Sequence, residues 1–73
     1  MRRRRSVTVQ PGTAGGWLVG GGGFVEKAHF SRKRDATLHG RELLQHHGGG
    51  GLIVHNLSGR IVDRDEVVPR QRP

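Results

Sequence analysis

The segment Ser31–His47 is the only part of the chain that reads as a helix, and strand-like runs lie on both sides of it. Small or apolar residues and one histidine share a single helical stripe: Ala36, Gly40, Leu43, Leu44 and His47. The sequence therefore predicts one helix that packs against strands contributed by both halves of the chain.

The ends of this helix carry their own signals. Ser31 is the expected N-cap, because its hydroxyl can accept a hydrogen bond from a backbone N–H two or three residues further on. Gly48 suits the C′ position after the last turn. Gly40 costs roughly 1 kcal/mol against alanine inside a helix, and its place on the stripe predicts a close approach to the sheet. Leu38 points away from the stripe, and we expect it to be exposed or to meet another subunit.

Five short runs are rich in β-branched, aromatic or alternating residues, as strands require. They are Val7–Val9, Trp17–Val19, Phe24–Phe30, Leu52–His55 and Arg60–Arg64. Gly20–Gly23 is expected to connect the second and third strands. Asn56–Gly59 reads as a hairpin turn with Gly59 in the left-handed conformation. These elements predict an α+β fold: a small antiparallel sheet in the order strand–strand–strand–helix–strand–strand, with one helix across one face.

Length and composition limit the core. With 73 residues, 32% of them hydrophobic, and no cysteine, the chain can form one domain without disulfides or thiolate metal sites. We expect a compact domain over residues 6–66, a disordered basic tail over 1–5 and a flexible C-terminal tail over 67–73. The core is expected to be one sheet layer against one helix, or to be completed by a second copy. Trp17 is the expected anchor of that core.

Positive charge gathers at two places. The net charge is +7, of which Arg2, Arg3, Arg4 and Arg5 supply four charges. Arg32, Lys33 and Arg34 occupy the first helical turn, where the positive end of the helix dipole makes each cation cost about 0.3–1 kcal/mol at low salt. A helix N-terminus surrounded by cations is also a good site for an oxyanion. Lys27, on the preceding strand, is expected to add to this patch. The alternative is a solvated basic face that tolerates the small cost.

Other kinds of site find little support. Phe24 follows the first tetraglycine where a phosphate-binding loop needs Lys and Ser or Thr. His39 and His46 lie about 10 Å apart along a helix, so we expect no metal site. Asp63 and Asp65 alternate with arginines and are expected to form surface ion pairs. No catalytic residue, cofactor or small-molecule substrate is expected. No apolar run approaches the ~20 residues of a membrane span, so we expect a cytoplasmic protein that does not contact membranes.

Part of the chain resembles a known family. The Gly-Trp strand at Trp17, the capped helix with Ala36, and the segment from Leu52 to Asp65 resemble a small bacterial domain of unknown function, family number 2188. The resemblance covers about residues 7–66 and is most specific in the second hairpin. The chain departs from the family pattern in its two tetraglycines and in Gly40. The resemblance implies a compact strand–helix–hairpin domain and brings no activity with it.

We expect a small, non-enzymatic accessory protein that binds the phosphate backbone of DNA or RNA without sequence preference. The expected contacts are Arg32, Lys33 and Arg34 with the Arg2–Arg5 arm as a mobile second contact. Three aromatic residues leave little for base stacking. The alternative is a structural or protein-interaction module that forms a homodimer through an open strand edge or Leu38, or binds an acidic protein.

Overall fold

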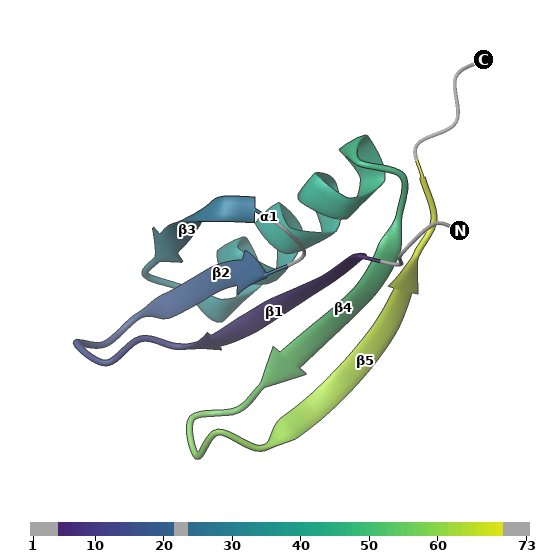
Figure 1. Ribbon diagram of the computed structural model, residues 1–73. Coiled ribbons are helices and arrows are strands. Elements are labelled where there is room, and N and C mark those ends of the chain that lie inside the picture. Colours follow the sequence, from purple (N-terminus) through teal and green to yellow (C-terminus); the bar gives the residue numbers. More distant parts are fainter. Residues whose placement is uncertain (1–4, 22–23, 70–73) are drawn as a thin grey trace.

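The computed structural model describes residues 5–21 and 24–69, with side chains described at all of these except 24–26. Five strands and one helix follow one another in the chain (Figure 1): β1 Arg5–Pro11, β2 Trp17–Gly21, β3 Phe24–Phe30, α1 Lys33–His46, β4 Gly50–His55 and β5 Ile61–Val67. This confirms the α+β class and the predicted order of elements. The expectations for Arg2, Arg3 and Arg4, for Gly22–Gly23 and for the chain beyond Pro69 concern residues outside those described.

The sheet is mixed, which corrects the expectation of an antiparallel sheet. Its strand order is β3-β2-β1-β4-β5. Three of the neighbouring pairs are antiparallel, whereas β1 and β4 are parallel, with Val7 opposite Leu52. The reason is the helix: α1 returns along the sheet after β3, so β4 starts at the same end of the sheet as β1. Parallel neighbours need a long crossover of this kind.

The core lies between one face of the sheet and α1, and among the described residues no element covers the opposite face of the sheet (Figure 1). Eight hydrophobic residues are buried among those described: Val7, Val9, Val19, Ala36, Leu44, Leu52, Val54 and Val67. Val67 was expected in the flexible tail, but it completes β5 and is 3% exposed. Arg5 likewise belongs to β1 and not to the N-terminal tail. Trp17 is half-buried at the margin of the core.

The helix begins one residue later than Ser31 would place it. Arg32 is the N-cap residue, and no side-chain hydrogen bond caps the first turn. The prediction of Ser31 as N-cap is therefore wrong, because the extended backbone at Arg32 puts the serine outside the helix. At the other end the prediction holds: Gly48 has a φ of +92°, and the Gly49 N–H donates to the Leu44 carbonyl at 2.6 Å, which closes the last turn.

Gly40 brings the helix close to the sheet, as predicted. A Cβ atom built on Gly40 would lie 3.0 Å from Leu52 Cδ1 and 3.2 Å from Val7 Cγ1. These separations are tighter than ordinary van der Waals contact, so the absence of a side chain sets the distance between α1 and the strands. Leu38, on another side of the helix, is 48% exposed, as expected.

The Asn56–Gly59 turn joins β4 to β5, as predicted. Asn56 Oδ1 accepts hydrogen bonds from the Ser58 N–H and the Arg60 N–H, both at 3.0 Å. Gly59 has a φ of +86°, in the left-handed region that favours glycine. The turn is therefore fixed by local chemistry, and it fixes where β5 starts.

Candidate nucleic-acid interface

The start of α1 presents one of the two groups of cations that the sequence predicted. Arg32 and Arg34 are exposed, while Lys33 is half-buried. The Lys33 ammonium lies 5.5 Å from the centroid of the Trp17 ring, a cation–π contact. Trp17 thus orients one cation of the group, whereas the two arginines are exposed to solvent.

The backbone at this end can also receive an anion. The first helical hydrogen bond runs from the Ala36 N–H to the Arg32 carbonyl at 3.1 Å. The preceding N–H groups of the first turn have no acceptor within the helix, and no side chain caps them. Asp35 is the acidic residue of this turn. Unpaired amides beside two guanidinium groups are the components of an oxyanion site.

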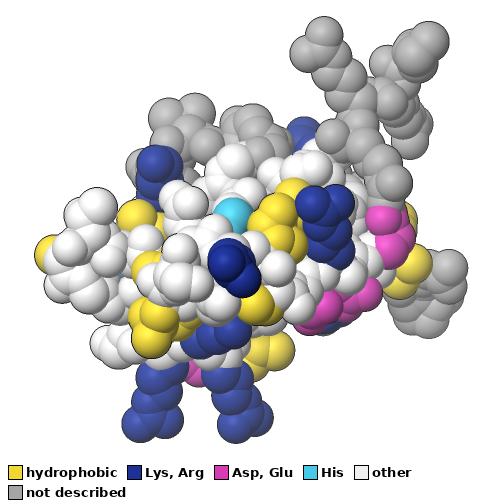
Figure 2. Space-filling model, turned by 90° about the horizontal axis from the view of Figure 1, so that it is seen from below, with side chains coloured by type: hydrophobic (Ala, Val, Ile, Leu, Met, Phe, Trp, Pro, Cys, Tyr) yellow, Lys and Arg dark blue, Asp and Glu magenta, His cyan; other side chains and the backbone are white. Residues whose placement is uncertain are grey.

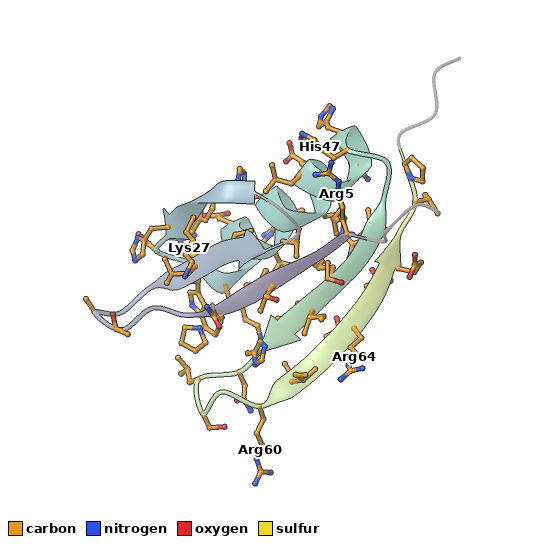
Figure 3. All side chains as sticks on the ribbon, viewed as in Figure 1. Arg5, Lys27, His47, Arg60 and Arg64 are labelled. Carbon is orange, nitrogen blue, oxygen red and sulfur yellow. The ribbon has the colours of Figure 1, made fainter. Side chains whose placement is uncertain are left out.

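A second element lies beside this helix end. The turn after β4 shares a surface hollow with Lys33, lined by Trp17, Lys33, Asn56, Leu57 and Ser58. The exposed Arg60 follows the turn, and Figure 3 shows its side chain projecting away from the body of the protein. Figure 2 shows Lys and Arg side chains projecting together from the lower margin of this side of the molecule. We call the group Arg32, Lys33, Arg34 and Arg60 the basic end.

Arg60 was missed as a site residue by sequence reasoning. Its placement depends on β4 lying beside β1, which brings the β4–β5 turn to the end of the sheet where α1 begins. No local pattern signals that long-range pairing. The available signal was a basic residue directly after a predicted hairpin turn.

The structure separates the other predicted contacts from the basic end. Arg5, labelled in Figure 3, is the strand partner of Gly50, just after the C-terminal end of α1. Lys33 lies over Trp17, which pairs with Pro11 at the far end of β1. Lys27 alternates with Ala28, which packs on the core, so it belongs to the uncovered face of the sheet. Neither residue joins Arg32 and Arg34.

An open groove runs between α1 and the edge strand β5. It is lined by Lys33, Arg34, Thr37, Leu38, Arg41, Val54 and Asp63. Cations lie on its helix side and Asp63 lies on its strand side. Next to it, Arg41 Nη2 donates to Asp65 Oδ2 at 2.6 Å. The expected ion pairing of Asp65 is confirmed, but its partner lies on the helix, in place of the expected Arg60 and Arg64.

Comparison with known proteins gives the family. A family model described as an uncharacterized protein conserved in bacteria, DUF2188, matches residues 7–67. The chain belongs to the DUF2188 family. Among curated proteins and among solved structures, no match is found.

The DUF2188 match includes Lys33, Trp17 and the turn at Asn56, so the basic end belongs to the family domain. In the described part of this DUF2188 chain, no three His, Cys, Asp or Glu side chains group as metal ligands would. Within the same residues, no helix has the length and apolar character needed to cross a membrane.

Proposed function

We propose that this DUF2188 protein is a non-enzymatic accessory protein that binds the phosphate backbone of nucleic acid through the basic end. The observation that carries the proposal is the start of α1, which no side chain caps and which carries the exposed Arg32 and Arg34. Phosphate oxygens accept hydrogen bonds from both kinds of donor, and they relieve the unfavourable meeting of cations with the helix dipole.

The same geometry favours a duplex over a single strand. Base stacking needs an exposed aromatic face, but Trp17 is half-buried and lies beneath the Lys33 ammonium. Backbone contacts carry no sequence information, so binding is nonspecific. A net charge of +7 adds long-range attraction to any polyanion. We place this activity in the cytoplasm, where bacterial DNA and RNA are found.

A mobility-shift series against duplex DNA, duplex RNA and single strands, at two salt concentrations, tests the proposal. The logarithm of the affinity should fall with the logarithm of salt concentration by about 0.9 for each phosphate contacted. Replacing Arg32 and Arg34 with Gln should flatten that slope by about two contacts. Lys27→Gln is the matched control, because it removes a charge from the uncovered face of the sheet. Absence of binding at low salt, or binding indifferent to salt, would contradict the proposal.

A second candidate is a protein-interaction module that binds an acidic segment in the α1–β5 groove. The exposed Leu38 lies in this groove with Lys33, Arg34 and Arg41, and this set suits a peptide that combines carboxylates with an apolar side chain. Fluorescence anisotropy with an acidic, leucine-containing peptide tests this candidate. Leu38→Ser should abolish peptide binding and leave duplex binding unchanged, because Leu38 contributes no phosphate contact.

A further inference from the structure

The edge strand β5 offers a row of backbone groups to another strand. It is the last strand of the sheet formed by the described residues. Its regular ladder with β4 runs from Asp63 to Val67, because the register shifts after Asp63 and Ile61 pairs with His55. Val62 is left over as a bulge. The outward N–H and C=O groups of a regular five-residue ladder are a template for strand addition.

This edge also carries exposed apolar side chains. Val62, beside the ladder, is 51% exposed, and Val68, just beyond it, is 68% exposed. Proteins often protect edge strands with charged residues, lysine above all, with proline or with a bulge. The β5 ladder has no lysine or proline, but it carries charges of both signs at Asp63, Arg64, Asp65 and Glu66, and it follows the bulge at Val62. This edge therefore suits only a partner strand whose charges complement its own.

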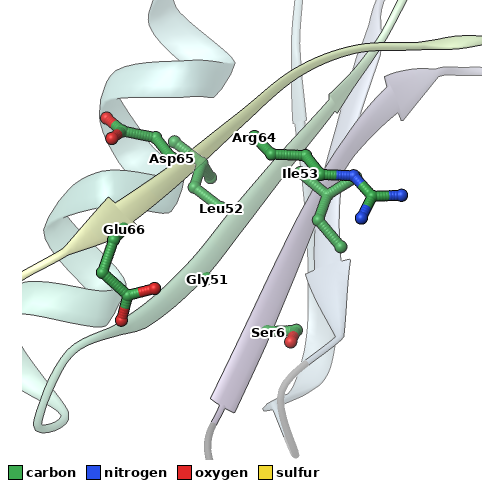
Figure 4. A pocket seen from close by; sticks show the side chains of 7 residues that line it. All are labelled: Ser6, Gly51, Leu52, Ile53, Arg64, Asp65 and Glu66. Carbon is green, nitrogen blue, oxygen red and sulfur yellow. The ribbon is translucent and has the colours of Figure 1, made fainter.

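We propose that a second copy of this chain pairs with β5 in antiparallel register, about a two-fold axis at Asp65, and forms a continuous sheet across the two copies. In that register Arg64 lies opposite Glu66 of the second copy, and the symmetry makes this opposite-charge pair twice. Val62 lies opposite Val68 of the second copy, so the exposed valines cover each other. Figure 4 shows Arg64 and Ile53 on the side of the sheet away from the helix.

Charge selects this register over its neighbour. A two-fold axis at Arg64 would set Arg64 against itself and Asp63 against Asp65, and like charges directly opposite each other destabilise a strand pair. The axis at Asp65 leaves one like pair, Asp65 with its own copy. The 2.6 Å ion pair with Arg41 offsets the charge of that carboxylate in each copy. Asp65 is also the middle residue of the regular ladder.

The α1–β5 groove adjoins the proposed contact between the two copies, on the helix side of the sheet. Leu38 and Val54 line the groove beside Asp63. A strand added to β5 would therefore lie next to these two apolar side chains. A second copy then covers more than the strand edge alone. This inference does not depend on nucleic-acid binding, and its test uses the protein without nucleic acid.

Multi-angle light scattering on the full chain, over a concentration series, measures the oligomeric state directly. We expect the mass to rise from the monomer value of 8.0 kDa toward twice that value as concentration increases. Hydrogen exchange on the wild-type protein provides a second measurement that needs no variant. Outward-facing amides between Asp63 and Val67 should become protected at high concentration. A constant mass of 8.0 kDa, or a dimer without that protection, would overturn the proposal.

Charge reversal tests the register. Arg64→Glu sets two like charges opposite each other twice, so the dimer should dissociate at least about tenfold more readily. The double variant R64E/E66R restores opposite charges and should restore the dimer. Arg60→Glu is the control, since it makes the same charge change before the ladder begins. If Arg64→Glu leaves the dimer unchanged, or if the double variant does not restore the dimer, the two β5 strands do not pair in the proposed register.

Discussion

Arg41, in the middle of α1, donates a 2.6 Å hydrogen bond to Asp65 on the edge strand β5. The two residues are 24 positions apart in the chain. Few residues link these two elements, because β5 has only Val67 buried in the core. The ion pair therefore adds to the few contacts between the edge strand and the helix.

The first prediction concerns this ion pair. Both side chains are more than a third exposed, so water and salt screen their attraction, and their coupling free energy should be about 0.2–1 kcal/mol. A double-mutant cycle with Arg41→Gln and Asp65→Asn, followed by urea unfolding in dilute solution, measures it. The coupling should shrink in 1 M salt. Additive effects of the two changes would show that the contact is not maintained in solution.

The second prediction concerns the spacing between α1 and the sheet. Gly40→Leu must place its side chain where Leu52 and Val7 already lie, and we expect the free energy of unfolding to fall by about 1–3 kcal/mol or more. Gly51→Ala is the control. A Cβ atom at Gly51 meets its nearest atom, Ser6 Oγ, at 3.7 Å, so that change should be nearly neutral. Similar losses for the two variants in urea unfolding would mean that close approach at Gly40 is unimportant.

The features that the sequence predicted correctly are local. Gly48 ends the helix and Gly59 turns the second hairpin because each adopts a positive φ that its immediate neighbours call for. The parallel pairing of β1 with β4 joins distant segments, and no local signal announces it. The same pairing decides the site: it brings Arg60 to the start of α1 and leaves Arg5 at the opposite end. The sequence shows which residues are charged, but the strand order decides which of them lie close together.

The third prediction concerns the turn between β4 and β5. Asn56 Oδ1 accepts hydrogen bonds from two backbone N–H groups and from the Ser58 hydroxyl, the last at 2.7 Å. Asn56→Ala should lower the free energy of unfolding by about 1–2 kcal/mol, because several donors lose their acceptor together. Asn56→Asp keeps the acceptor and should recover most of this loss. Ser58→Ala, which removes one donor, should cost less than Asn56→Ala, and the reverse order in thermal unfolding would contradict this account of the turn.

The last prediction separates stability from binding at the start of α1. Arg32 is the N-cap residue and gives no side-chain hydrogen bond to the first turn. Arg32→Asp places an acceptor and a negative charge there, so the free energy of unfolding should rise by about 1 kcal/mol. Duplex affinity should fall in the same variant, because a phosphate contact becomes a repulsion.

Ser31→Ala completes this experiment. If Ser31 capped the helix, its loss would cost about 1 kcal/mol, but Ser31 lies outside the helix and we expect almost no change in the urea midpoint. If Ser31→Ala is destabilised, or if Arg32→Asp gains no stability, Ser31 and not Arg32 is the N-cap residue in solution. An Arg32→Asp that becomes more stable and loses duplex binding would identify the uncapped arginine as a residue kept for its partner at a cost to the fold.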